Sequence, residues 1–254
     1  MSKFFTDDEQ VVRLWDREEV VKVINKHSYY HSNEMRREEL DSLWVRQPSH
    51  RRTASLGYNN GFYVGFEEIE RHYVGYREEQ RFAALKPYHD ADANVELCQR
   101  NLGLGCAAMN TATTPLVYIA EDGISAQYLG YRLGFQSIGK PDGSADSYMD
   151  FGLIHCDLLK EDGAWKIWHL ELERDHTVTV GQNYANVPVR RPDSEDPLYA
   201  DFGKPTLERE VYNPFFGWEN MWYDMPRPYT SFTDERSYGP EGNLGKPYYK
   251  RDHR

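Results

Sequence analysis

The sequence predicts an α+β protein in which a strongly curved antiparallel sheet wraps around helices and a long irregular arm follows. Three observations support this class. Helical patterns occupy most of residues 16–86, two long hairpin patterns fill residues 111–175, and residues 176–254 are rich in proline and aromatic side chains without periodicity. We therefore expect one domain at residues 1–175 and an extension at residues 176–254.

The composition limits the class of protein. A chain of 254 residues can bury a sizeable core without disulfides. Cys98, Cys106 and Cys156 lack CxxC or Cys/His spacing, which favours reduced structural cysteines in a cytoplasmic protein. The net charge of −11 disfavours nucleic acid and anionic membrane as partners. The beginning, MSKFFTDDEQ, has no apolar stretch, and 18 apolar residues never run together, so we expect neither secretion nor a membrane span.

The N-terminal segments have the spacing of amphipathic helices. A first helix is expected from Asp16, which would cap it, with Val20, Val23 and Ile24 at helical spacing. The following MRREELDSLWV has the pattern of a second helix, and Pro48 would stop it. Both helices are expected to pack on the sheet.

The middle of the chain alternates strand and helix patterns. Residues 49–66 predict a short hairpin around an Asn-Gly turn. Residues 67–86 predict a helix with a charged outer face that ends near Pro87. Residues 88–106 resemble a helix with a glycine exit, although the glycines near its end weaken this interpretation.

Two long hairpins follow. Each has an Asp-Gly turn, Asp122-Gly123 and Asp162-Gly163, between runs rich in tyrosine, valine, isoleucine, leucine and tryptophan. Asp-Gly between apolar strands is among the strongest hairpin patterns in a sequence. These hairpins predict the curved antiparallel sheet.

The C-terminal extension is unusually aromatic. A disordered tail would be poor in aromatic side chains, so we expect an irregular arm that packs on its own domain or on a neighbouring subunit and closes one end of a pocket. Its anchors would be Phe215, Phe216, Trp218, Trp222, Tyr223 and Tyr229. The 19 tyrosines and 6 tryptophans of the whole chain suit a pocket for aromatic ligands, or an aromatic core and subunit interface.

Several segments in this order resemble a known family. GFYVGFEEI, EDGISA and EDGAWKI, together with the first helix, resemble the SnoaL-like branch of the nuclear-transport-factor-2-like superfamily over residues 10–175. The resemblance implies a cone-shaped α+β barrel with a deep pocket at its open end. Members include polyketide cyclases, dehydratases, steroid isomerases, non-catalytic transport factors and a branch that eliminates formaldehyde from lignin-derived diarylpropanes. The fold alone does not choose among these functions.

The enzymes of this superfamily work by cofactor-free acid–base chemistry in an apolar cavity, so we searched for polar side chains that point inward. Strand alternation places Trp165, Ile167 and His169 on one face, and the resemblance implies that the Trp and Ile of W-K-I face the interior. His169 is therefore the predicted general base. A structural histidine bonded to the backbone is the alternative, and an outward His169 would refute this site.

The first helix carries a polar stripe. His27, Tyr30, His31 and Glu34 follow the i, i+3, i+4, i+7 spacing of one helix face. Tyr30 is a predicted catalytic residue that would orient a phenol or carbonyl, with an ordinary core tyrosine as the alternative. The two histidines lack an HExxH glutamate and a third ligand, so no metal site is predicted.

Asparagines take the place of the usual dyad. The resemblance implies an aspartate on the first helix and a histidine before the first long hairpin, whereas this chain has Asn33 and Asn110 there. Both are predicted to bind a substrate hydroxyl or a developing oxyanion. Tyr58 and Asn60 precede a glycine near the expected pocket mouth and are predicted catalytic residues, with simple turn chemistry as the alternative.

Further binding residues are expected on the hairpins. Tyr131 and Arg132 are neighbours, so only one can face the pocket; an inward Arg132 would favour a phenolate or carboxylate. Trp168 completes the predicted substrate-binding set. His155 and Asp157 share one strand face and are interpreted as outer-face or interface residues.

Together these features predict a cofactor-independent lyase for a hydroxylated phenolic substrate. It would release formaldehyde from a lignin-derived diarylpropane diol, or release water. The alternatives are an isomerase or cyclase of a polyketide- or steroid-like ligand, and a non-catalytic small-molecule-binding or scaffold protein. The predicted partners are a small aromatic substrate and further copies of the chain, as a dimer or trimer, without nucleic acid or membrane.

Overall fold

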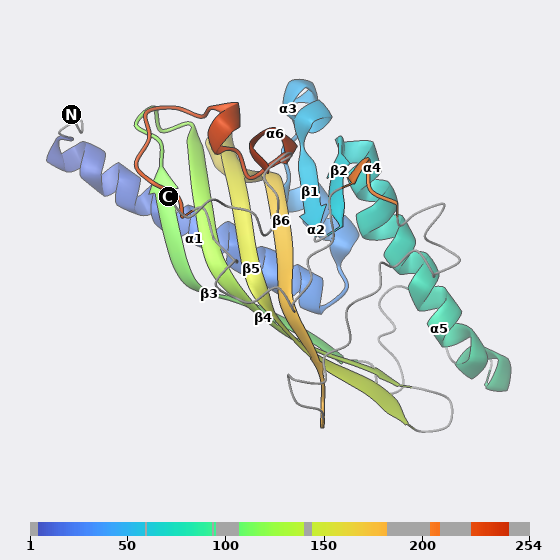
Figure 1. Cartoon of the computed structure of the whole chain (residues 1–254). Helices are drawn as coiled ribbons and strands as arrows, with labels where there is room; N and C mark the ends of the chain where they lie inside the picture. The colour runs from blue at the N-terminus through green and yellow to red at the C-terminus, as the bar shows by residue number, and fades with distance from the viewer. Residues whose placement is uncertain are drawn as a thin grey trace.

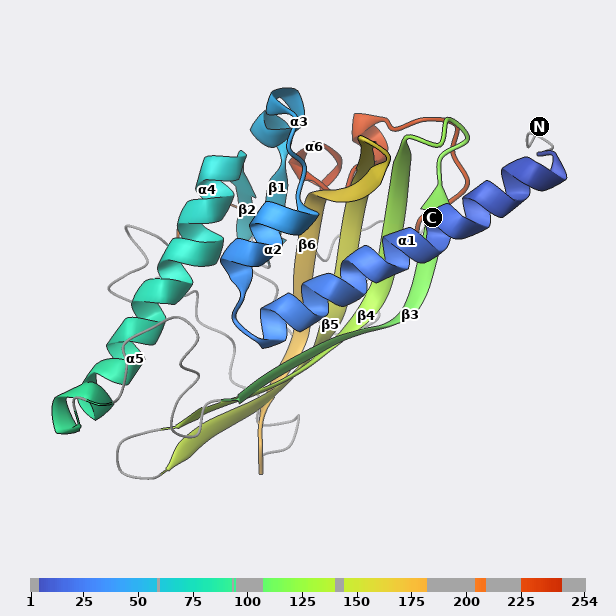
Figure 2. The same cartoon turned by 180° about the vertical axis from the view of Figure 1, so that it is seen from behind.

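The computed structural model describes residues 5–58, 60–92, 94, 107–139, 144–181, 204–208 and 225–243. Figure 1 shows long, curved strands with helix α1 crossing one side of them, and Figure 2 shows the same arrangement from behind. The helices are α1 (Asp7–Ser32), α2 (Arg36–Leu43), α3 (Pro48–Thr53), α4 (Phe66–Glu70), a π-helix (Arg71–Tyr76), α5 (Arg77–Ala91), a 3₁₀ turn (Asp234–Arg236) and α6 (Pro240–Asn243). The strands are β1 (Ser55–Tyr58), β2 (Gly61–Val64), β3 (Ala107–Ile119), β4 (Ser125–Gly139), β5 (Ala145–Glu161), β6 (Ala164–Thr179) and β7 (Leu207–Glu208).

The strands form one mixed sheet in the order β3-β4-β5-β6-β1-β2-β7. Neighbouring strands are antiparallel except β1 and β6, which are parallel. The predicted α+β class, with a curved sheet and helices against it, is confirmed, and it is the class of architecture that the SnoaL-like resemblance implies.

The sheet has two chemically different sides. We call the side that packs on α1 the helix face; Ile154, Leu158 and Ile167 belong to its core. The opposite side, to which His155 and Asp157 point, is the outer face. The main core lies between the helix face and helices α1 and α2, and its fully buried members include Val20, Ile24, Leu40, Trp44, Ile154, Ile167 and Leu170.

Helix α1 begins earlier than the sequence predicts. Thr6 is the N-cap and forms a capping box with Glu9, whose Oε2 lies 2.8 Å from the Thr6 backbone nitrogen. The predicted cap, Asp16, lies inside the helix and is buried. Its Oδ1 accepts hydrogen bonds from Trp165 Nε1 at 2.9 Å and Lys160 Nζ at 2.6 Å. Asp16 therefore fixes α1 to the β5–β6 hairpin rather than starting the helix.

The predicted turns are present. β1 and β2 pair across a turn that ends at Gly61, whose φ is +145°. In the second long hairpin Asp162 and Gly163 both have positive φ, 50° and 80°, as a type I′ turn requires. Gly123, in the first, has φ +70°. All three hairpins are confirmed.

A second predicted helix boundary, at Pro87, is also wrong. The helix expected to end near Pro87 continues as α5 to Ala91. A proline inside a helix removes only one backbone hydrogen bond, and the next turn is held by the Lys86–Asp90 ion pair at 2.7 Å and by the Asp92 amide donating to the Tyr88 carbonyl at 2.9 Å. The glycine exit expected before residue 107 lies outside the described residues.

The described parts of the C-terminal extension pack on their own chain. Leu207–Glu208 adds strand β7 to the edge of β2. Residues 225–243, which we call the outer segment, are coloured orange to red in Figure 1 and cross the ends of the long strands. Its Tyr229 and Thr230 carbonyls accept the amides of Glu121 and Asp122 at 2.9 and 3.0 Å. The other predicted aromatic anchors lie outside the described residues.

Two further predictions concern the surface and the thiols. The outer face of the long strands exposes an apolar group formed by Met109, Tyr131, Leu133, Met149 and Phe151. Such a surface is compatible with the predicted homo-oligomer, which stays a prediction.

Cys156 is buried, and burial raises the pKa of its thiol well above the ordinary value, as suits a structural cysteine. In the part of the chain that the structure describes, no helix is long and apolar enough to cross a membrane.

Candidate functional site

The predicted face of His169 is wrong because β6 contains a bulge. Leu158 pairs with Ile167, whereas its neighbour Asp157 pairs with His169, so Trp168 is an extra residue in β6. One extra residue inverts the alternation of all side chains that follow. His169 therefore shares the outer face with Asp157 instead of the helix face with Ile167.

His169 is a buried partner of the outer segment. Its Nδ1 lies 3.0 Å from Asp157 Oδ2 and 2.8 Å from Ser237 Oγ, and its side chain is 2% exposed. Gly239 covers the ring so closely that a Cβ there would lie 2.6 Å from Nδ1. Trp168 packs against the same ring in a tilted arrangement, with ring centres 4.0 Å apart, and donates from Nε1 to Thr53 Oγ1 at 2.9 Å. Both predicted residues thus lie away from any cavity on the helix face.

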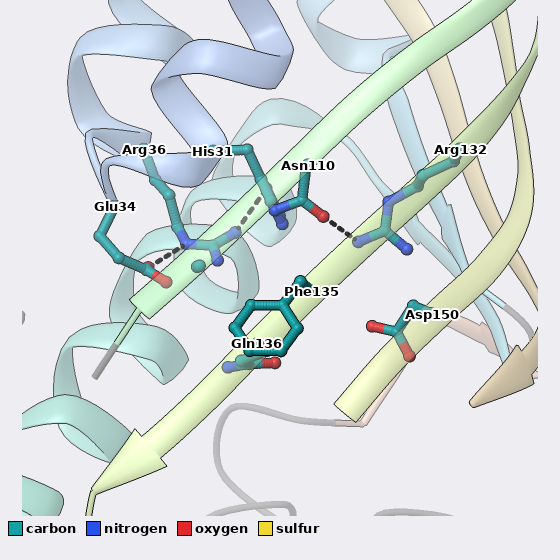
Figure 3. A pocket seen from close by; sticks show the side chains of 9 residues that line it. His31, Glu34, Arg36, Asn110, Arg132, Phe135, Gln136 and Asp150 are labelled. Carbon is teal, nitrogen blue, oxygen red and sulfur yellow. Dashed lines mark hydrogen bonds and ion pairs between the residues drawn. The ribbon is translucent and has the colours of Figure 1, made fainter. Parts of the chain in front are cut away.

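A cavity does open on the helix face, where α1 ends above strands β3, β4 and β5. Its volume is about 30 Å³, enough for water or a small reacting group but not for an aromatic ring. Figure 3 shows polar side chains entering it from two sides. The lining residues are His31, Glu34, Arg36, Ala108, Asn110, Arg132, Phe135, Gln136 and Asp150.

The turn between α1 and α2 builds the first wall. Helix α1 ends at Ser32 with Asn33 as its C-cap, and Glu34 has φ +55°, so the chain reverses sharply before Arg36 starts α2. The reversal brings Arg36 Nε to 2.9 Å from Glu34 Oε2 and Arg36 Nη1 to 3.1 Å from His31 Nδ1. All three side chains are buried. Burial alone would lower the pKa of Arg36, but Glu34 with Tyr73 and Tyr58 more than offsets it, so this pKa is raised and Arg36 stays charged.

The strands build the second wall. Arg132 on β4 donates from Nη2 to Asn110 Oδ1 on β3 at 2.9 Å. Gly134 leaves the floor open, because a Cβ there would lie 3.1 Å from Asn110 Oδ1 and 3.4 Å from Asp150 Cβ. Arg132 and Asp150 are 5% and 6% exposed. The cavity therefore joins a carboxylate, a guanidinium and an amide in a nearly dry setting, where electrostatic interactions are strong.

A second layer supports His31 from behind. Tyr73 donates its hydroxyl proton to Glu39 Oε2 at 2.8 Å, and the same hydroxyl oxygen lies 3.0 Å from His31 Nδ1. Glu39 Oε1 lies 2.8 Å from His27 Nδ1. Burial, and then the charge of Glu39, raise the pKa of Tyr73 well above the ordinary value, so its phenol stays protonated. Tyr73 can donate a hydrogen bond but cannot act as a tyrosinate base.

Two predicted residues lie in the cavity. Arg132 faces it, while its neighbour Tyr131 is 52% exposed on the outer face. Asn110 lines it, as the resemblance implies. His31, from the predicted stripe of the first helix, also lines it, whereas His27 is bonded to Glu39 behind it.

Four predicted residues lie elsewhere. Asn33 donates from Nδ2 to the Tyr29 carbonyl at 2.8 Å and so closes the end of α1. Tyr30 is half-buried against the core. Tyr58 packs edge-on against Tyr63 and His72, and Asn60 belongs to the β1–β2 turn. None of the four lines the cavity.

Sequence reasoning missed several residues of the site: Glu34 as a cavity residue, Arg36, Asp150, Glu39 and Tyr73. Glu34 and Arg36 lie in a turn between two predicted helices, a place where functional side chains often concentrate. Asp150 could have been predicted from strand alternation, because it lies an even number of residues before Ile154 and Leu158 of the core and therefore shares their strand face.

One group of side chains has the donor types of a metal site. On the outer face His155, Glu171 and Glu173 place ligand atoms within 4.8 Å of one another. However, Glu171 Oε2 lies 3.4 Å from Nδ1 of the ring and Glu173 Oε2 lies 4.0 Å from Nε2. The two carboxylates therefore approach different nitrogens of one imidazole, whereas a single ion would bind only one of these nitrogens.

Comparison with known proteins gives matches in structure only. A scan against protein-family models finds no match, and a search of curated proteins finds none. A protein provisionally named scytalone dehydratase from Novosphingobium aromaticivorans is 14% identical over 70% of this chain and 96% of that chain, with a TM-score of 0.42. The hexachlorocyclohexane dehydrochlorinase LinA-type3 from Novosphingobium barchaimii is 14% identical over 70% and 99%, with a TM-score of 0.45. Aln2 from a Streptomyces species is 14% identical over 68% and 95%, with a TM-score of 0.39. At 14% sequence identity, the functional residues of these proteins are not transferred to this chain.

Proposed function

We propose that the chain is a cofactor-independent lyase that eliminates water or formaldehyde from a hydroxylated phenolic substrate. The observation that supports it is the helix-face cavity, in which Asp150 faces the same small space as His31 and Arg132. A carboxylate that takes a proton, beside donors that stabilise a negative oxygen, is the minimum that an elimination requires.

The chemistry follows from a phenolic substrate. When a base removes the phenolic proton, the electron pair moves through the ring and expels hydroxide from the benzylic carbon, and protonation releases it as water. Formaldehyde is lost from the quinone methide that this first step forms: the base removes the proton of a hydroxymethyl group on the next carbon, and the C–C bond to that group breaks. Its electrons form a new C=C bond and restore the aromatic ring, so water and then formaldehyde leave. Arg132 and Asn110 would hold the oxygen that carries the negative charge.

The size of the cavity constrains the binding mode. A space of about 30 Å³ admits the phenolic oxygen, on which Asp150 and Arg132 would act, and not the ring, so the aromatic part of the substrate must lie outside it. Phe135 and Gln136 line the cavity beside the polar groups. The lignin-derived diol is the finer part of the proposal, and it rests on the SnoaL-like resemblance and on the inward Arg132.

The test is a substrate screen with matched variants. Purified protein is incubated with phenolic diaryl diols, and released formaldehyde and new ultraviolet absorbance are measured. The parent should turn over at least one of them, and Asp150→Asn should lose about 10²–10⁴-fold of the rate. Tyr131→Phe, on the outer face beside Arg132, is the control and should keep the rate. Binding without product would leave a non-catalytic binding protein, and an Asp150→Asn variant as fast as the parent would remove the carboxylate from the mechanism.

A further inference from the structure

The ring nitrogen Nδ1 of His31 lies between two groups that demand different protonation. Arg36 Nη1 is 3.1 Å away and the Tyr73 hydroxyl oxygen is 3.0 Å away. A guanidinium has donors only and cannot accept a hydrogen bond. Beside Arg36, Nδ1 must therefore be the acceptor, and the ring proton of a neutral His31 must lie on Nε2.

Tyr73 favours the opposite arrangement. Its hydroxyl has one proton, and Glu39 Oε2 at 2.8 Å is a charged acceptor that outcompetes a neutral ring nitrogen. With that proton donated to Glu39, the Tyr73 oxygen can only accept from His31, which would require a proton on Nδ1. Arg36 and the Tyr73–Glu39 pair thus compete for the tautomer of one histidine.

Arg36 has the stronger position. Its Nε is held by Glu34 Oε2 at 2.9 Å, and its guanidinium carbon lies 4.8 Å from the centre of the Tyr73 ring, so it is fixed from two sides. It is also a charged donor, which forms stronger hydrogen bonds than a neutral one. The other ionisable groups near His31 are His27, with ring centres 5.6 Å apart, and Asp150 and Arg132 of the cavity.

We propose that Arg36, held by Glu34, is a positioning residue that keeps His31 in the Nε2–H tautomer. His31 then enters the cavity as a hydrogen-bond donor to the oxygen that gains negative charge, and Asp150 is the proton acceptor. The catalytic meaning of this assignment rests on the proposed lyase function, whereas the tautomer itself does not. A neutral histidine used as a donor in this way stabilises an oxyanion without losing its proton.

Nitrogen NMR of histidine-labelled protein tests the assignment, because the shift of each ring nitrogen shows whether it carries a proton. The chain has nine histidines, so His31 is assigned by difference with His31→Gln. The parent should show a protonated Nε2 and a bare Nδ1 for His31. The double variant Glu34→Gln/Arg36→Met removes both charges together, so no lone buried charge remains. In it the tautomer ratio should move toward Nδ1–H by roughly tenfold or more, the factor that one charge-assisted hydrogen bond contributes.

Two further variants separate positioning from general structure. Tyr73→Phe removes the competitor and should leave the Nε2–H tautomer of the parent in place. Arg37→Met removes the neighbouring arginine, which pairs with Glu70 on the surface at 2.7 Å, and should change nothing. If the double variant does not fold, Glu34→Gln alone loosens Arg36 and should give a mixture of tautomers.

The outcomes are distinct from those of the lyase test. A protonated Nδ1 in the parent, or a charge-free variant that keeps Nε2–H, overturns the role of Arg36 even if the protein is an active lyase. The predicted tautomer with no turnover of any substrate supports the positioning role and contradicts the proposed function alone.

Discussion

Two buried polar clusters lie on opposite faces of the same sheet, and they differ in what surrounds them: the outer segment covers one, and the other borders a cavity. On the outer face, Asp157 accepts from Gln127 at 2.9 Å, from the Tyr238 amide at 2.7 Å, and from Ser237 and His169 at 3.0 Å each. Both carboxylate oxygens of Asp157 therefore accept hydrogen bonds from groups of the protein itself. On the helix face, Asp150 and Arg132 border a space that water or a substrate group can enter.

A buried histidine–aspartate pair does not by itself identify a reaction site. His169 has the arrangement expected of a general base, an imidazole with a carboxylate on Nδ1. However, Gly239 and Trp168 pack against its ring and cover it. His31 has an arginine in the same position and borders the cavity. We therefore interpret the outer cluster as structural and propose the cavity as the reaction site.

The largest expected contrast is between His31→Gln and His169→Gln. On the substrate identified in the screen, His31→Gln should lower the rate by about 10²–10³-fold, the cost of losing one oxyanion donor. His169→Gln should keep a rate close to that of the parent when both are assayed well below the unfolding temperature. Steady-state kinetics of both variants measures this, and the reverse ranking would restore His169 as the catalytic histidine.

Asp157 should matter for stability instead. Asp157→Asn replaces the charged acceptor of the outer segment, and we expect the free energy of unfolding to fall by about 2–4 kcal/mol, because hydrogen bonds to a buried charge are strong and costly to leave unmade. Denaturant unfolding measures this. Asp162→Asn, in an exposed turn where asparagine is equally suited, is the control and should change it by less than about 0.5 kcal/mol. Equal stability of the two variants would mean that the outer segment does not depend on Asp157.

A smaller, pH-dependent effect is expected at Glu161, which lies in neither cluster. Burial would raise its pKa, but the backbone amide of Arg46, the ring of His50 and the amide of Gln47 outweigh burial, so the pKa is lowered. A carboxylate with a lowered pKa stabilises the fold above its ordinary pKa, and this contribution is lost as the pH falls through the folded pKa. Glu161→Gln should therefore cost about 1–2 kcal/mol at pH 7.

The same variant should approach the parent in stability as the pH falls below about 4 and through the lowered pKa of the folded state, where the carboxylate is protonated in both states. Unfolding free energies measured from pH 7 to pH 3 give the comparison. A constant difference across this range would show that the Glu161 charge is irrelevant. Glu121→Gln, whose carboxylate has no bond among the described contacts of the β3–β4 turn, is a suitable control.

Local patterns predicted the fold better than the site. The Asp-Gly turns specify their hairpins within a few residues, so Asp162 and Gly163 were sufficient evidence for one of them. The face of His169 depends instead on Trp168, whose extra place in β6 is stabilised by a contact with Thr53 far away in sequence. No short-range pattern contains that contact.

The cavity escaped prediction for the same reason. Arg36 follows a reversal at Glu34, which is not a glycine yet has a positive φ, and the Glu34 carboxylate accepts a hydrogen bond from Arg36 across this reversal. Asp150 joins them from a strand more than a hundred residues later. Of the cavity residues, Asn110 was expected from the family resemblance, and Arg132 was one of two neighbours, with Tyr131, of which strand alternation allows only one to face inward.

The smallest structural change tests the cavity most directly. Gly134→Ala adds one methyl group to the floor, 3.1 Å from Asn110 Oδ1, and a contact that tight requires a shift of a few tenths of an ångström. The free energy of unfolding should fall by about 1–3 kcal/mol, and turnover, assayed well below the unfolding temperature, should fall by about tenfold or more, since a small misplacement of reacting groups is costly. Leu133→Ala, one residue earlier and 41% exposed on the outer face, should leave turnover unchanged. If both variants keep full turnover, the reaction does not take place beside Gly134, and the helix-face cavity is not the active site.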